Sequence, residues 1–135
     1  MIRLEKFDAA FYPQLISSIK DARELMQFAG PEFTFPLTEE QIEKSLSDKN
    51  RIAFRVVTIS DDSTIGHCEI CFKDNFANVG RILIMDENIR GKGIGKQIVT
   101  LLLEFILENS KQRNVELNVF DFNIGAIKCY KKIGF

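Results

Sequence analysis

The sequence predicts a mixed α/β (α+β) domain in which helices flank a central β-sheet. Two segments rich in β-branched and aromatic residues, 51–59 and 64–72, are separated by a short polar turn cluster, which is typical of an antiparallel hairpin. A later strand–helix–strand–helix stretch implies a parallel pair joined by a right-handed crossover. Together these observations predict a mixed sheet and the element order β-α-α-β-β-β-α-β-α.

Length and composition predict a single domain and exclude several classes of binding partner. A chain of 135 residues is expected to form one domain, 1–135, with a core large enough to need no metal or disulfide. Its 18 Lys+Arg and 19 Asp+Glu give a net charge of −1, which argues against a nucleic-acid partner or a membrane-surface partner. No secretory signal and no apolar run long enough to span a membrane is present, and three cysteines favour free thiols in a cytoplasmic protein.

The N-terminal part predicts one strand and two helices. Alternating apolar residues at 2–5 indicate a short first strand. A single amphipathic helix is expected over 11–26, because one helical stripe carries Phe11, Leu15, Ile19, Ala22 and Met26. Residues 30–36 form a loop, and Thr38 with Gln41 is typical of a capping box that begins the second helix.

The C-terminal part predicts two further strands and two helices. Within the expected strand 79–86, the run Ile82–Met85 lacks alternation, which is typical of a strand covered on both faces. A strongly apolar helix from about 93 to 109 follows. We expect another strand at 115–120 and a last helix from 123 to about 132.

A glycine-rich basic turn, Arg90–Lys96, lies between the buried strand and the long helix. Glycines allow unusual backbone conformations and close approach of a ligand, while the first amides of a helix point outward and attract anions. The turn therefore predicts a phosphate or pyrophosphate site. The residues of the turn do not match a P-loop, because Gln97 stands where Ser or Thr is needed. They do not match a dinucleotide-binding fingerprint either, because Lys96 replaces the third glycine.

Two motifs in this order resemble the GNAT N-acetyltransferase superfamily. The family turn Arg/Gln-x-x-Gly-x-Gly/Ala is matched by Arg90, Gly93 and Gly95. The second motif, Asn-x-x-Ala-x-x-x-Tyr followed by Gly-Phe, is matched by Asn123, Ala126, Tyr130, Gly134 and Phe135. The element order is also similar to this fold, so the resemblance extends over the whole chain.

The resemblance implies a coenzyme A site and a catalytic acid. The turn would bind the pyrophosphate of acetyl-CoA through Arg90, Gly91, Lys92, Gly93, Ile94, Gly95 and Lys96. The exposed backbone of Leu83, Ile84 and Met85 would pair with the pantetheine arm, and the amide of Ile84 or Met85 would polarise the thioester carbonyl. Asn123 would bond the pantetheine, and Tyr130 would protonate the departing thiolate.

The implied function is acetyl transfer from acetyl-CoA to a small-molecule or peptide amine by direct attack. The acceptor ammonium must lose a proton first, and Glu69 is the candidate base, although a surface carboxylate on an alternating strand is the more common role. A non-catalytic coenzyme A-binding module and a nucleotide-binding regulatory domain remain alternatives. Relatives usually continue past Phe135 with further strands, so these strands are expected to be missing. Either a second chain, as in a homodimer, covers the open sheet edge, or the sequence is truncated, or the edge stays bare.

The remaining signals predict structural roles and no metal. Cys68 and Cys71 form a CxxC within a strand, where they point to opposite faces and cannot chelate zinc together. His67 is expected to be structural. The aromatic residues Phe28, Phe33 and Phe35 form either a substrate wall or a lid over the core.

Overall fold

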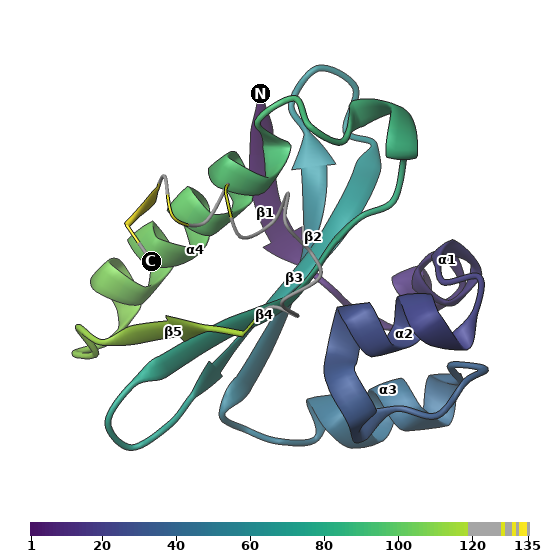
Figure 1. Ribbon diagram of the computed structural model, residues 1–135. Helices are drawn as coiled ribbons and strands as arrows, with labels where there is room; N and C mark the ends of the chain where they lie inside the picture. The colour runs from purple at the N-terminus through teal and green to yellow at the C-terminus, as the bar shows by residue number, and fades with distance from the viewer. Residues whose placement is uncertain (119–127, 129–130, 132, 135) are drawn as a thin grey trace.

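The computed structural model describes residues 1–118, 128, 131, 133 and 134. Within this part of the chain, a sheet of five strands has the order β1-β2-β3-β4-β5 (Figure 1). The strands are β1 (Ile2–Lys6), β2 (Arg51–Thr58), β3 (Thr64–Phe72), β4 (Ala77–Ile84) and β5 (Val115–Leu117). The first four are antiparallel to their neighbours and β5 is parallel to β4, which confirms the mixed sheet.

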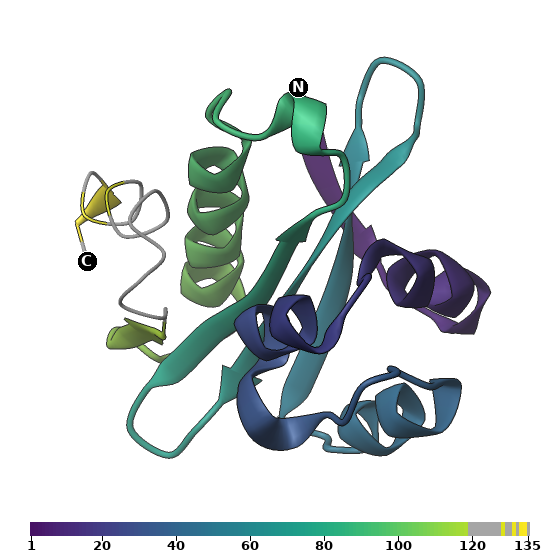
Figure 2. The ribbon, with the colours of Figure 1, turned by 45° about the vertical axis from the view of Figure 1, so that its right-hand side comes forward.

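Helices cover both faces of the sheet. The helices are α1 (Tyr12–Ser18), α2 (Ala22–Ala29), α3 (Glu39–Leu46) and α4 (Ile94–Asn109), with short 3-10 turns η1 (Ala9–Phe11), η2 (Gly30–Glu32) and η3 (Glu87–Ile89). Figure 2 shows α4 on one side of the sheet and α1 to α3 on the other. No helix in the described ranges is long and apolar enough to cross a membrane.

The single helix expected over 11–26 is wrong, because the structure has two helices there. Ile19 takes an extended backbone (ψ 108°) and ends α1. The Asp21 side chain then accepts a hydrogen bond of 2.8 Å from the amide of Glu24 and caps α2. A local N-cap therefore interrupts a stripe whose apolar members Leu15 and Ile19 still face the same core.

Several other element predictions are confirmed. The Thr38 hydroxyl accepts from the Gln41 amide at 3.3 Å and caps α3, whereas the Gln41 side chain bonds Thr34 and Pro36 and does not complete the capping box. The hairpin forms between β2 and β3, and α4 begins one residue after the predicted start. The predicted last helix lies mostly outside the described residues, although Lys128, Lys131 and Ile133 have helical backbone.

A β-bulge interrupts the pairing of β3 with β4. The pairs on its two sides are Glu69–Gly80 and His67–Leu83. Two residues of β4 thus lie opposite the single residue Cys68, and one of them, Arg81, has a positive φ of 49°. Because successive side chains of a strand alternate between faces, one extra residue exchanges the faces of everything after it.

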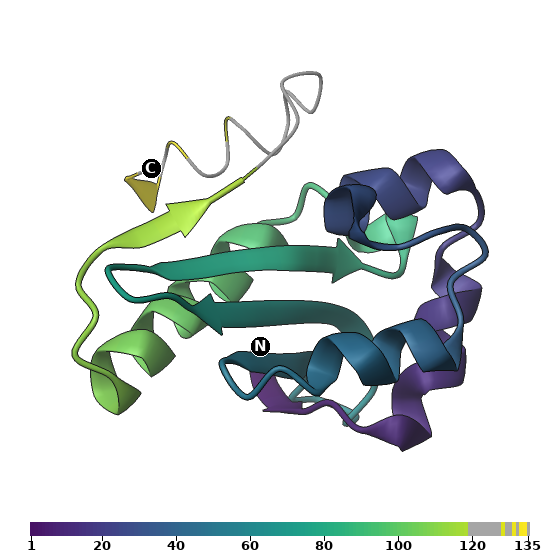
Figure 3. The same cartoon turned by 90° about the horizontal axis from the view of Figure 1, so that it is seen from below.

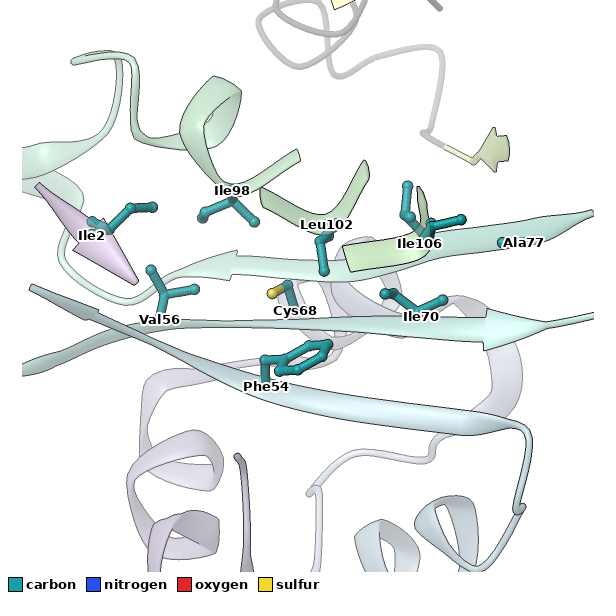
Figure 4. Packing of buried hydrophobic residues seen from close by; sticks show 10 residues of the cluster. Ile2, Phe54, Val56, Cys68, Ile70, Ala77, Ile98, Leu102 and Ile106 are labelled. Atoms are coloured by element: carbon teal, nitrogen blue, oxygen red, sulfur yellow. The ribbon is translucent and has the colours of Figure 1, made fainter. Parts of the chain in front are cut away.

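The bulge distributes the apolar end of β4 between two cores. Ile82 and Ile84 pack on the α4 side, whereas Leu83 and Met85 pack on the side of α1 to α3, which confirms that this run is covered on both faces. On the α4 side, Ile98, Leu102 and Ile106 reach toward Val56, Cys68 and Ile70 of the sheet (Figure 4).

The pairing of β4 with β5 is short. It runs from Ala77 opposite Val115 to Val79 opposite Leu117, and β4 then continues to Ile84 without a partner strand on that side among the described residues. Figure 3 shows β5 turning away from the line of β4. Within the described ranges, this edge of β4 therefore has no partner strand beyond the bulge.

Candidate functional site

The turn between β4 and α4 depends on glycine conformation. Gly91 and Gly93 have φ values of 78° and 82°, in the left-handed region that side chains disfavour. A Cβ atom at either position would meet no atom within 4 Å, so backbone conformation and not crowding requires glycine here. Gly93 is the residue that precedes α4, and no side chain caps the helix.

The backbone amides of residues 91–96 in this turn have no hydrogen-bond partners in the part of the chain that the structure describes. The amide of Gln97 donates to the carbonyl of Gly93 at 3.1 Å and makes the first hydrogen bond of α4. Within the described part of the chain, none of the six amides from Gly91 to Lys96 has a hydrogen-bond acceptor. Such outward amides, with the positive end of the helix dipole and exposed lysines at 92 and 96, suit an anionic group.

The edge of β4 next to this turn has one amide facing away from the sheet. The Met85 amide donates to the carbonyl of Ile65 at 2.8 Å and is used within the sheet. Because neighbouring residues of a strand direct their amides to opposite sides, the Ile84 amide faces away from β3. Of the two expected oxyanion donors, the Met85 amide is thus already engaged, and only Ile84 is suited to the role.

The Arg90 side chain bonds the carbonyl of Ile84, which lies on the same edge of β4. Its Nε and Nη2 atoms donate to the carbonyl of Ile84 at 3.1 and 2.8 Å. This bidentate contact ties the start of the basic turn to the end of β4.

The face of the sheet toward α2 and α3 carries a buried ionic cluster. Glu69 is only 4% exposed. Its Oε1 accepts from Nη1 of Arg51 at 2.9 Å and from Nη1 of Arg81 at 3.2 Å, and its Oε2 contacts Nε2 of His67 at 2.7 Å. Burial raises the pKa of Glu69, but the hydrogen bond from His67 and the charges of Arg81 and Arg51 outweigh burial and hold it below its ordinary value.

This environment does not fit the expected role of Glu69 as a base. A base must reach the proton that it removes, and its pKa should lie near the working pH. Both oxygens of Glu69 are engaged, and its lowered pKa makes it a weak proton acceptor. Glu69 therefore anchors Arg51 and Arg81 on the sheet.

The lowered pKa of Glu69 predicts a loss of stability in acid. The ionised form stabilises the fold fully above the pKa of the unfolded state, about 4.3, and this contribution is lost as pH falls through the lower pKa of the folded state. Urea unfolding at pH 7, 5, 4 and 3 should show a steeper decline below pH 4 for the natural protein than for Glu69→Gln. Parallel declines would contradict the predicted linkage.

Arg81 joins four elements around this cluster. Besides Glu69, it donates to the Ser45 hydroxyl on α3 at 2.6 Å and pairs with Glu32 on η2. Its guanidinium also lies over the Phe33 ring, 4.4 Å from the centroid. Neither Arg81 nor Arg51 was predicted from the sequence, although an arginine inside an otherwise apolar strand was the available signal for Arg81.

A pocket opens beside this cluster. Its volume is about 380 Å³, and it is lined by the end of α2, the η2 turn, β4 around the bulge, Arg51 and Asn118. Phe28 contributes to its wall and is buried, whereas Phe33 packs under Arg81 and Phe35 is exposed. The pocket thus meets β4 at the bulge, three residues before the strand ends at Ile84 and the chain continues toward the glycine turn.

The family model for the Acetyltransferase (GNAT) family matches residues 19–135, which include the turn, the bulge and the pocket walls. The chain belongs to this family. The SPbeta prophage-derived uncharacterized N-acetyltransferase YokL of Bacillus subtilis (strain 168) is 31% identical over 100 residues, which cover 72% of this chain and 52% of that protein. The chain thus spans about half the length of this curated relative.

Solved GNAT structures share the fold. An aminoglycoside acetyltransferase AAC(6')-Ib in complex with coenzyme A has a TM-score of 0.80 and 16% identity, covering 100% of this chain and 84% of that chain. A spermidine N-acetyltransferase from Vibrio cholerae in complex with CoA and spermine has a TM-score of 0.78 and 20% identity, covering 98% and 79%. At these identities the likeness establishes the GNAT fold alone.

Two residues that the GNAT resemblance assigns, Asn123 and Tyr130, lie outside the described residues. Cys68 packs in the α4-side core, and no group of three or more potential metal ligands forms within the described ranges. The His67 ring lies edge-on to Phe7 at 4.4 Å, and its Nδ1 has no partner in the part of the chain that the structure describes.

Proposed function

We propose that this chain transfers an acetyl group from acetyl-CoA to the nitrogen of a small amine. The observation that carries the proposal is the row of amides from Gly91 to Lys96, which have no acceptor among the described residues and include those of two left-handed glycines at the start of α4. Family membership and these amides support the same cosubstrate, because a diphosphate is the anion that such a turn suits.

The turn and β4 would bind different parts of acetyl-CoA. The amides of the turn, with Lys92 and Lys96, would hold the diphosphate. The edge of β4 that has no partner strand among the described residues would align the pantetheine arm, and the Ile84 amide would donate to the thioester carbonyl oxygen. Acetyl-CoA supplies the acetyl thioester. Arg90 bonds the Ile84 carbonyl, so it would leave that carbonyl when an amide of the pantetheine arm bonds there.

The acceptor would enter through the pocket at the bulge, on the face of the sheet opposite α4. In the transfer, the amine nitrogen attacks the carbonyl carbon, the new C–N bond replaces the C–S bond, and the sulfur leaves as a thiolate. Tyr130 would donate its phenolic proton to that thiolate, and the proton released by the amine would pass to water, because Glu69 is not accessible.

Replacing Tyr130 with Phe tests the proposed acid. Tyr130→Phe should lower kcat by about 10²–10⁴-fold, the usual contribution of a positioned acid, while the Kd for acetyl-CoA changes far less. Steady-state kinetics and calorimetry measure the two effects. Equal kcat values would remove Tyr130 from the mechanism.

Two assays separate the proposed activity from its alternatives. Calorimetry should show binding of acetyl-CoA and much weaker binding of ATP. Thiol release from acetyl-CoA should then depend on added amines. Binding without amine-dependent release would indicate a coenzyme A-binding module, and preferential binding of ATP would indicate a nucleotide-binding domain.

A further inference from the structure

We infer that the acceptor amine also carries a carboxylate, and that Arg51 binds this carboxylate in the pocket between η2 and the bulge of β4. The inference rests on the function proposed above and names the substrate class of the same site. It comes from the charges that line the pocket and from the partners that each of them already has.

The charged groups of the described pocket lining are Glu32, Arg51 and Arg81. Glu32 is paired with Arg81, so its carboxylate is neutralised. The Arg81 guanidinium is also already paired, because it bonds Ser45 and Glu69 as well as Glu32. The described lining therefore offers no carboxylate that lacks a cationic partner.

Arg51 is a charged group of the described lining that still has N–H donors without a partner among the described residues. A guanidinium has five N–H donors, and Arg51 uses only Nη1, which donates to Glu69 at 2.9 Å, in the part of the chain that the structure describes. Its side chain is 15% exposed, and it lines the pocket at the first residue of β2. Charged donors that a ligand can reach from the pocket favour a ligand with acceptor oxygens, because charge-assisted hydrogen bonds are stronger than those between neutral groups.

Geometry favours a carboxylate over other acceptors. Two adjacent N–H groups of a guanidinium match the two oxygens of a carboxylate, and such bidentate pairs are among the stronger hydrogen-bonded contacts. The bond to Glu69 fixes Arg51 in advance, which reduces the entropy lost on binding. A volume of about 380 Å³ suits a small molecule of this kind.

The same charges disfavour a polycation. A polyamine would meet two guanidinium groups and would find both neighbouring carboxylates, Glu32 and Glu69, already paired. The likeness to a spermidine acetyltransferase establishes the fold alone, so it does not transfer that acceptor to this chain.

Matched acceptors test the inference without a mutation. L-ornithine and putrescine differ by one carboxylate, as do L-lysine and cadaverine, and their kcat/KM values can be compared by thiol release from acetyl-CoA. We expect each carboxylate-bearing acceptor to exceed its diamine by about tenfold or more, the usual value of a charge-assisted hydrogen bond. Dipeptides with a free or an amidated C-terminus then distinguish a free amino acid from a peptide as the source of the carboxylate.

Arg51 variants locate the effect. Arg51→Gln should bring the ratio within each pair close to one by lowering the amino acid's kcat/KM alone, and Arg51→Lys should retain part of the preference. Arg3→Gln, a change at a surface arginine paired with Glu5 and Asp62, should leave the ratio unchanged. Thermal unfolding identifies any variant that fails to fold, and the comparison within the natural protein does not depend on the variants.

The outcomes separate this inference from the proposed function. Absence of acetyl-CoA binding in calorimetry would overturn both. If acetyl-CoA binds and the diamines react as well as or better than the amino acids, the inference is rejected and the acetyltransferase function stands. An equal loss for both members of a pair in Arg51→Gln would also reject it. If no acceptor reacts, calorimetry with coenzyme A present must show ornithine binding more tightly than putrescine, or the inference fails.

Discussion

Glu69→Ala is expected to lower the free energy of unfolding by about 3–5 kcal/mol, the usual cost of removing one partner from a buried ion pair. The substitution leaves the guanidinium groups of Arg51 and Arg81 without their shared anion, and it removes the partner of His67 Nε2. Because small domains have only about 5–15 kcal/mol of stability, the variant should unfold at a much lower urea concentration.

Two controls define the cause of this loss. Glu69→Gln keeps the shape and one acceptor oxygen, so it should destabilise less than Glu69→Ala. Glu5→Gln removes the partner of Arg3 in an exposed pair, where we expect a change below about 1 kcal/mol. A loss at Glu69→Ala as small as that at Glu5→Gln would show that the cluster does not hold the fold together.

Lys96→Glu is expected to weaken acetyl-CoA binding by about tenfold or more without weakening the fold. Lys96 is exposed in the first turn of α4, where the turn amides have no partners among the described residues. A glutamate there suits the helix dipole and should raise stability slightly, by about 0.3–1 kcal/mol. It also changes the local charge by two units, which opposes a diphosphate at this site.

The opposite signs of the two effects make Lys96→Glu a specific test. Calorimetry gives the Kd for acetyl-CoA, and urea unfolding gives the stability. Lys49→Glu makes the same charge change beside the start of β2, at the other end of the sheet. This variant should leave the Kd for acetyl-CoA within about twofold, since salt screens exposed charges over about 8–10 Å. If both variants bind acetyl-CoA equally well, the turn does not bind its diphosphate.

The sequence predicted those features that depend on residues close together in the chain. The left-handed conformations of Gly91 and Gly93 follow from glycine chemistry over a few residues, and the hairpin follows from β-rich segments beside a turn cluster. The break between α1 and α2 was also local. The cap formed by Asp21 and Glu24 was readable, but the apolar stripe continued across it and predicted one helix.

The ionic cluster could not be predicted in the same way. Its members come from separate elements, and Glu32, Arg51, Glu69 and Arg81 meet only after the sheet has formed. The position of the bulge at Arg81 could not be predicted from the sequence either. An apolar run without alternation does not show where one extra residue is inserted. The surroundings of Glu69, which argue against its predicted role as a base, were hidden for the same reason, since its partners Arg51 and Arg81 are remote in sequence.

We propose that the amides of residues 91–96, which have no acceptor among the described residues, bind the diphosphate of acetyl-CoA. Amide chemical shifts, recorded by two-dimensional ¹H–¹⁵N NMR during titration with acetyl-CoA, test it most directly. We predict large shifts and slower hydrogen exchange for the amides of Gly91 to Lys96, saturating with the Kd from calorimetry. Saturable binding that leaves these six amides unchanged would contradict the claim.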